Sequence, residues 1–210
     1  MNKQLFAIML VVGLTTNYVQ AQFAFGLRAG LNLTNFTEKF NDKKVTDTNY
    51  IHGYQAGIVG EFAVSNVCAV QPAIIFTTQG GEKYQGMYSI KINYLQIPIN
   101  ALYKINLGNV KLLLQAGPYL GIALGGKYKV DDMGVLGGEF KIKFGNKADE
   151  MKPVDVGFGL GTGLQFKNFQ AGLNYNFGIA NLYNVTEDYK KSLKINGLSV
   201  TLTYLFGNEH

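Results

Sequence analysis

Apolar and polar residues alternate along most of this chain with a period of two. The first instance is residues 23–33, FAFGLRAGLNL, where each odd position is apolar and each even position is small or polar. Side chains along a β-strand point alternately to its two faces. The segment is therefore predicted to form a strand with one apolar face and one face that accommodates Arg28 and Asn32.

Seven more segments repeat this pattern. The clearest is residues 154–166, VDVGFGLGTGLQF, in which Val, Phe and Leu dominate one face and Asp, Gly and Gln the other. Most of the segments reach the roughly 9–11 residues that a tilted strand needs to cross a bilayer. Besides residues 23–33, the predicted strands span about 50–64, 68–79, 90–105, 110–124, 154–166, 169–180 and 194–206.

The connections between these strands alternate between short and long. The short ones are residues 65–67, 106–109 and 167–168. The long, more polar ones are about 37–49, 80–89, 125–153 and 181–193. Barrels of bacterial outer membranes join their strands by short periplasmic turns and long outer loops in this alternation. The pattern predicts an up-and-down arrangement with both chain ends on the periplasmic side.

The composition of the polar face indicates which side of the sheet faces outward. It consists mainly of Gly, Gln, Asn, Ser and Thr and carries few charges, which is unusual for a surface in water. We therefore expect an all-β, eight-stranded antiparallel transmembrane barrel with its apolar face toward lipid; a soluble lipocalin-like carrier of apolar ligands is the alternative. Aromatic residues expected at the two membrane interfaces are Phe23, Phe25, Phe36, Tyr50, Tyr103, Phe166, Phe169, Tyr204 and Phe206.

The N-terminus has the features of an export signal. Lys3 precedes an apolar run over residues 5–14, and Val19-Gln20-Ala21 fits a cleavage site. The run is shorter than the roughly 20 residues of a membrane-spanning helix. We expect a signal peptide over residues 1–21, cleaved after Ala21, and one outer-membrane barrel domain over residues 22–210.

Charge and cysteine content exclude several other functions. Without Lys3, 18 basic residues stand against 14 acidic ones and are scattered along the chain, whereas a nucleic-acid surface would gather them. No nucleic-acid partner is expected. The single cysteine, Cys68, has no partner for an internal disulfide.

An eight-stranded barrel is just wide enough for side chains to fill its interior, so no open pore is expected. Arg28 and Glu61 are on adjacent predicted strands, and we expect them to form an ion pair. Inward-facing glycines such as Gly157 could make room for a ligand, but we expect them to let Tyr119 or long Arg and Gln side chains pack across the barrel. The polar residues expected in the interior are Arg28, Glu61, Gln96, Lys104, Tyr119 and Asp155.

Several segments, in this order along nearly the whole mature chain, resemble the PorT-like outer-membrane β-barrel family of Bacteroidetes. They are GLRAGLN (26–32), YLQIPI (94–99), AGPYLG (116–121), VDVGFGLG (154–161) and YLF (204–206). The resemblance implies the barrel fold and the outer membrane, and the founding member is associated with protease secretion. Gln96 stands where this family leads us to expect a glutamate. Leu202, Tyr204 and Phe206 resemble the final strand that the barrel-assembly machinery recognises.

For function, we expect a monomeric, non-enzymatic barrel surrounded by outer-membrane lipid, without a cofactor. Its 125–153 loop repeats the alternation at residues 138–144, and an exposed strand edge there could recruit a protein by strand addition. The alternative is a small lipid-modifying enzyme with His52 as base, and Asp42, Asp47 and Ser89 as possible neighbours. No spacing typical of a metal site appears, and the acidic pairs Asp131-Asp132 and Asp149-Glu150, which could attract calcium, are expected to be solvated in loops. The other histidine, His210, is expected on the periplasmic side.

Overall fold

The computed structural model describes residues 23–40, 43–45, 48–83, 88–130, 137–147, 150–184 and 191–207. In these ranges no helix has the length and apolar composition needed to cross a membrane. The strands are β1 (Phe23–Phe40), β2 (Lys43–Val45), β3 (Thr48–Asn49), β4 (Ile51–Ala63), β5 (Cys68–Lys83), β6 (Tyr88–Asn106), β7 (Lys111–Val130), β8 (Gly138–Lys141), β9 (Val154–Phe166), β10 (Phe169–Gly178) and β11 (Lys191–Phe206).

Eight of these strands form a closed ring in the order β1, β4, β5, β6, β7, β9, β10 and β11. Each neighbouring pair is antiparallel, and the ring closes where β11 pairs with β1. This seam runs from Phe25 opposite Phe206 to Phe40 opposite Lys191. The predicted eight-stranded antiparallel barrel is confirmed.

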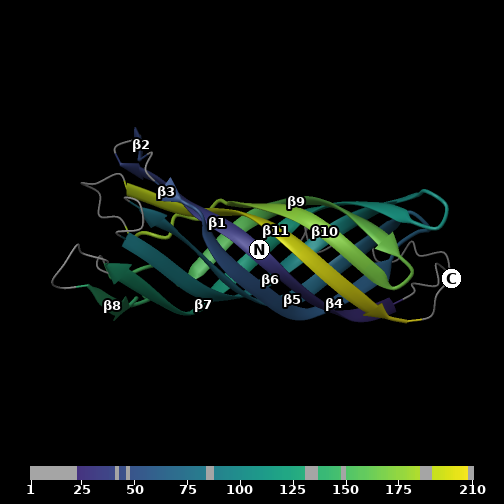
Figure 1. Ribbon diagram of the computed structural model, residues 1–210, viewed down its shortest axis with the longest axis horizontal. Helices are drawn as coiled ribbons and strands as arrows, with labels where there is room; N and C mark the ends of the chain where they lie inside the picture. The colour runs from purple at the N-terminus through teal and green to yellow at the C-terminus, as the bar shows by residue number, and fades with distance from the viewer. Residues whose placement is uncertain are drawn as a thin grey trace, which may run out of the picture.

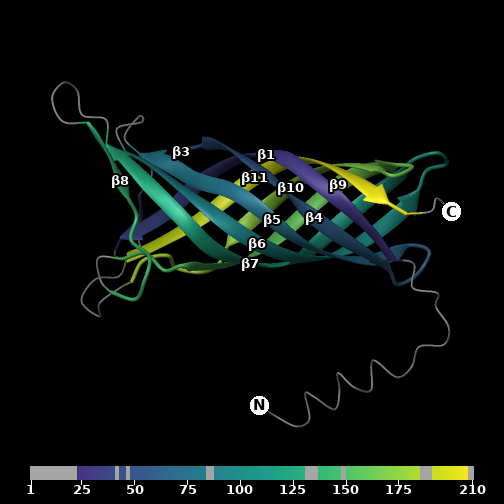
Figure 2. The same cartoon turned by 90° about the horizontal axis from the view of Figure 1, so that it is seen from below.

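The two ends of the barrel differ (Figure 1). The small strands β2, β3 and β8 lie at one end, where the long connections are, and β11 ends beside the short turns at the other. Figure 2 shows the same separation from a second direction, with β8 standing out from the rim. The turn at residues 167–168 is tied to β11 by a hydrogen bond from Leu205 N to Asn168 O (2.8 Å). We call the end with β2, β3 and β8 the outer end.

The apolar face of the sheet is on the outside of the ring. Leu27 and Phe158 are exposed, whereas Gln96 and Asp155 are buried in the interior. The same alternation continues along all eight strands of the ring, for example as exposed Val200 and Leu202 beside buried Thr201. A soluble carrier would have the opposite arrangement, with an apolar lumen and a polar exterior.

Several strands run further at the outer end than their alternation predicted. β1 continues to Phe40, β5 to Lys83 and β7 to Val130, and β11 already begins at Lys191. Outward positions such as Thr37 and Lys39 on β1 are polar there, so the contrast between the two faces is lost. The backbone pairing does not depend on that contrast, and the sheet continues beyond its apolar band.

A β-bulge divides β7 into two parts with opposite facing. Tyr94 of β6 lies opposite Ala123, but its neighbour Asn93 lies opposite Gly125, so Leu124 has no counterpart. Odd positions of β7 point inward below Leu124. Above it the even positions do, because Tyr128 lies opposite Ile90, which is on the inward face of β6.

The prediction that Phe36 lies at the membrane interface is wrong. Only 1% of Phe36 is exposed, because even positions of β1 point into the barrel and the strand keeps its register up to Phe40. The predicted strand ended at residue 33. Phe36 was therefore beyond its end, where alternation no longer indicates on which face a side chain lies. Phe25, Phe169, Tyr204 and Phe206 do lie outside, and their rings pack together around the other end of the seam.

The seam predicts how truncations affect assembly. Removal of residues 207–210 is expected to leave a folded barrel in the membrane fraction, because every β1–β11 pair is kept. Removal of residues 191–210 is expected to abolish insertion, because β1 and β10 would each present an unpaired edge to lipid. The measurement is the gel mobility of unheated samples, in which a folded barrel migrates differently from the boiled chain. A correctly inserted product lacking β11 would contradict the role of the seam.

Candidate functional site

Arg28 lies in the middle of the barrel interior and is held from two sides. On β1 it faces Thr203 of β11, and its Nε donates to Thr203 Oγ1 (2.9 Å). Its Nη2 donates to Gln71 Oε1 from β5. A buried guanidinium needs several acceptors to offset the water that it loses. Here uncharged acceptors supply these bonds.

Glu61 is the centre of the same network. Its Oε2 accepts hydrogen bonds from Gln71 Nε2 (3.0 Å) and Gln170 Nε2 (2.9 Å). Its Oε1 forms an ion pair with Lys104 of β6. Glu61 thereby connects β4 with β5, β6 and β10 across the narrow lumen.

The predicted direct ion pair between Arg28 and Glu61 is wrong, because Gln71 lies between them. Arg28 is opposite Gly57 in the β1–β4 pairing, and Glu61 is four residues further along β4. At about 3.3 Å per residue, this offset is roughly 13 Å along the strand. The amide of Gln71 spans the gap by accepting from Arg28 and donating to Glu61.

A second polar contact joins β7 to β9. The hydroxyl of Tyr119 donates to Asp155 Oδ2 (3.1 Å). Gly157 is opposite Tyr119, and a Cβ at this position would overlap the tyrosine ring. The glycine therefore makes room for Tyr119, as the sequence suggested. A Cβ at Gly159 would likewise come within 2.8 Å of Asn176 Oδ1.

Gln96 borders the small cavity that remains in the lumen. The cavity has a volume of about 40 Å³ and is lined mainly by polar side chains, among them Arg28, Gln115 and Asn174. This space is sufficient for about two water molecules. The residues predicted for the interior thus contribute to a polar layer inside the barrel.

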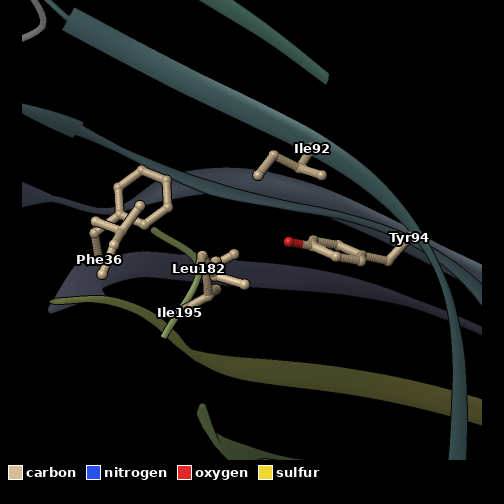
Figure 3. Packing of buried hydrophobic residues seen from close by; sticks show 6 residues of the cluster. Phe36, Ile92, Tyr94, Leu182 and Ile195 are labelled. Carbon is tan, nitrogen blue, oxygen red and sulfur yellow. The ribbon is translucent and has the colours of Figure 1, made fainter. Parts of the chain in front are cut away.

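Toward the outer end, buried apolar side chains pack into a cluster that we call the outer plug (Figure 3). Leu182 belongs to the segment after β10 rather than to a strand, and none of it is exposed. Backbone hydrogen bonds from Leu182 N to Leu193 O and from Lys152 N to Leu182 O, both 2.9 Å, fix the segment. The buried members of the plug are Phe36, Ile92, Tyr94, Leu182, Leu193 and Ile195.

Tyr94 brings a polar atom into the outer plug. Figure 3 shows its hydroxyl directed toward Leu182 and Ile92. This buried oxygen has no hydrogen-bond partner in the described part of the chain. A buried hydroxyl without a partner loses its hydration and gains nothing in return.

Charged residues cover the plug at the outer rim. Glu38 forms an ion pair with Lys83 and accepts a hydrogen bond from the hydroxyl of Tyr183 (3.2 Å). Burial lowers the pKa of Lys83, and the positive charge of Lys191 lowers it further. Burial also raises the pKa of Tyr183. Lysines therefore gather at the rim around one carboxylate.

The upper part of β7 and β8 form a hairpin beyond this rim. Tyr128 and Phe140 lie opposite each other, and their rings stack with centroids 5.0 Å apart. On the other face of the hairpin, Lys127 forms an ion pair with Glu139, whose pKa is lowered by this contact. β8 occupies the place beside β7 that β9 holds lower down.

The remaining sequence candidates do not come together as a reaction centre. His52 is exposed on the outward face of β4, and in the described residues no hydrogen bond or ion pair joins its imidazole to another side chain. Ser89 is on β6, two strands away. Among the residues that the structure describes, no cluster of His, Cys, Asp and Glu could hold a metal. Residues 1–21 with Ala21, and Asp42, Asp47, Asp131, Asp132, Asp149 and His210, lie outside the described residues.

Two residues that matter most to the lumen were not among the predicted ones. Gln71 joins Arg28 to Glu61, and its inward position on β5 was the available signal. Leu182 fills the outer plug from a segment expected to be a surface loop. No periodicity could have indicated it, because the residue is not on a strand.

Comparison with known proteins identifies the family. The family model for the outer membrane protein beta-barrel domain matches residues 18–184 of the 210. The chain therefore belongs to this family of outer-membrane barrels, and its location is the bacterial outer membrane. A comparison with curated proteins finds no match.

The chain is also similar to solved barrels of low sequence identity. Neisserial surface protein A is 18% identical, with a TM-score of 0.47 over 87% of this chain and 97% of that one. Ail of Yersinia pestis is 16% identical, with a TM-score of 0.44 over 88% and 99%. A major outer membrane protein of Thermus thermophilus is 13% identical, with a TM-score of 0.45 over 85% and 99%.

The Glu61 network predicts a large effect of one isosteric change. Glu61→Gln removes the negative charge that Lys104 needs and is expected to lower the free energy of unfolding by about 3 kcal/mol. The double variant Glu61→Gln, Lys104→Met is expected to recover most of this loss. Because the chain has no tryptophan, urea unfolding in lipid vesicles is followed by far-ultraviolet circular dichroism.

The Lys127–Glu139 pair provides a matched control for that experiment. Its side chains are 62% and 53% exposed, against 12% and 7% for Lys104 and Glu61. Glu139→Gln is expected to leave the free energy of unfolding nearly unchanged, because water screens the exposed pair. Equal losses for the two glutamine variants would show that Glu61 is not a structural centre.

Tyr94 gives a prediction of the opposite sign. Tyr94→Phe keeps the ring in the outer plug and removes the unpartnered hydroxyl, so the free energy of unfolding is expected to rise by about 1 kcal/mol. Tyr119→Phe, which removes a hydroxyl bonded to Asp155, is expected to lower it by a similar amount. The same urea titration measures both. A destabilised Tyr94→Phe variant would mean that the hydroxyl is bonded in solution.

Proposed function

We propose that this protein is a monomeric, non-enzymatic barrel that acts as a docking element for another envelope protein, through the hairpin of β7 and β8. The observation that carries the proposal is the position of β8, which adds a short strand beside β7 beyond the first residue of β9. In the described residues, β8 pairs with β7 alone, so its second edge offers backbone groups to a further strand.

The side chains of the hairpin suit such a partner. Phe140 is 50% exposed and extends, with Tyr128, an apolar strip along one face. The opposite face carries Lys127, Lys129 and Lys141 beside Glu139. An extended segment with alternating apolar and acidic residues would match both faces when added to β8.

The interior favours a role outside the lumen. The polar layer and the outer plug occupy much of the bore, and the cavity bordered by Gln96 in this layer has a volume of about 40 Å³. His52, the candidate base, is isolated on the lipid-facing side of β4. We therefore place the function on the outer surface rather than in transport through the barrel or in lipid modification.

The proposal extends to the setting of the protein. The resemblance to the PorT-like family of Bacteroidetes favours an envelope assembly connected with secretion. Export would use the signal at residues 1–21, and outer-membrane lipid would surround the barrel. Leu202, Tyr204 and Phe206 lie on the lipid-facing side at the end of β11, where the barrel-assembly machinery could contact them during insertion.

Phe140→Asp tests the docking role. The charge disrupts the apolar strip without touching the barrel, so a stoichiometric protein partner that co-purifies with the wild-type chain from native membranes is expected to be lost. Tyr50→Asp is the matched control: Tyr50 is also an exposed aromatic (57%) at the outer end, but it is not on the hairpin. Native mass spectrometry in mild detergent gives the stoichiometry. A wild-type chain that emerges alone, or equal loss in both variants, would refute the proposal.

A further inference from the structure

An open cleft lies at the outer end, between the β5–β6 rim and the β7–β8 hairpin. Its volume is about 500 Å³, within the range of small-molecule sites and more than ten times that of the cavity in the lumen. The described residues that line it are Lys83, Tyr88, Ser89, Ile90, Tyr128, Lys129, Lys141, Ile142, Lys143 and Met151.

The floor of this cleft is apolar and continuous with the outer plug. Ile90, Ile142 and Met151 line the cleft and also pack against the buried residues of the plug. The bulge at Leu124 turns Tyr128 to the same side as Ile90. The exterior of the barrel is apolar because it contacts lipid, but this surface is in the mouth and faces water. Burial of such a surface by an apolar ligand is favourable.

The margin of the cleft is basic. Its described lining includes four lysines and no acidic residue. Two nearby carboxylates already have partners: Glu38 is paired with Lys83, and Glu139 with Lys127. No hydrogen bond or ion pair in the described part of the chain engages the ammonium groups of Lys141 and Lys143. Lys141 is the last residue of β8, and Lys143 follows two residues later, on the other side of Ile142 in the sequence.

We propose that this cleft binds an amphipathic anion, a ligand with an aliphatic body and a single anionic head such as a medium-chain alkyl carboxylate. The aliphatic body lies on Ile90, Ile142 and Met151, and the head reaches the ammonium groups of Lys141 and Lys143. The plug beneath the cleft stops the ligand at the surface, so the site is a receptor for the anion and not the entrance of a channel. Lys141 belongs both to this site and to the hairpin face proposed for a protein partner, whereas Phe140 belongs to the hairpin surface alone.

The first test is a titration with decanoate, using decanol as the neutral probe of equal chain length. The full mature chain in lipid nanodiscs carries labelled isoleucine and methionine methyl groups. Decanoate is expected to shift the methyl signals of Ile90, Ile142 and Met151 saturably, and to bind about 3- to 10-fold more tightly than decanol. Added salt is expected to weaken the binding of decanoate and to leave the binding of decanol unchanged. Equal affinities, or shifts confined to lipid-facing Ile58 and Ile74, would overturn the proposal.

Lysine variants assign the head group. The double variant Lys141→Gln, Lys143→Gln is expected to weaken decanoate binding about 3- to 10-fold and to leave decanol unchanged. The matched control is Lys39→Gln, Lys147→Gln, which removes the same charge from two exposed outer residues that do not line the cleft. The proposal fails if both double variants behave alike.

Two further measurements separate this site from its alternatives. Dextran sulfate has the charge but no aliphatic body; if it shifts the cleft methyl groups and decanoate does not, the site is one for polyanionic sugars and the proposal fails. Phe140→Asp, which lies outside the cleft lining, is expected to bind decanoate normally even if it loses a protein partner. Failure of the docking proposal and failure of the ligand site are therefore distinguishable.

Discussion

The closure of the backbone hydrogen-bonding ring between β1 and β11 is the constraint on which the rest of this structure depends. Lipid offers no partner for an N–H or C=O group, so a sheet can cross a membrane only when its first and last strands pair. Closure with eight strands fixes the bore. A bore of this width leaves space for little more than side chains. Each inward polar group must therefore find its hydrogen-bond partners among neighbouring side chains.

The interior solves this problem in two layers of different chemistry. In the middle, Arg28 and Glu61 are joined through the amide of Gln71, Gln170 also donates to Glu61, and Lys104 forms an ion pair with Glu61, so each of these three charges has a partner. Toward the outer end, aliphatic and aromatic side chains form the outer plug. The polar layer gives directional contacts that specify the register between strands, and the plug excludes water from above.

The sequence predicted the ring well, because a lipid-facing strand must alternate and the facing of each residue follows from counting. The sequence was a poorer guide to facing and contacts where the difference between an apolar outward face and a polar inward face disappears. Phe36 was assigned to the wrong side because the outer end of β1 is polar on its outward face. Arg28 and Glu61 were expected to meet, since adjacency of strands was known but register was not. The burial of Leu182 could not be predicted, because it depends on how the segment after β10 folds back into the mouth of the barrel.

The bulge at Leu124 has a consequence for how this barrel can diversify. A single unmatched residue there exchanges the inward and outward faces of the part of β7 that follows it and of β8. The strands that cross the membrane keep their facing. Loss of that residue would turn Tyr128, which now points to the same side as Ile90, away from the mouth of the barrel. One codon at a strand junction can thus invert the chemistry of the exposed tip and leave the membrane-embedded fold intact.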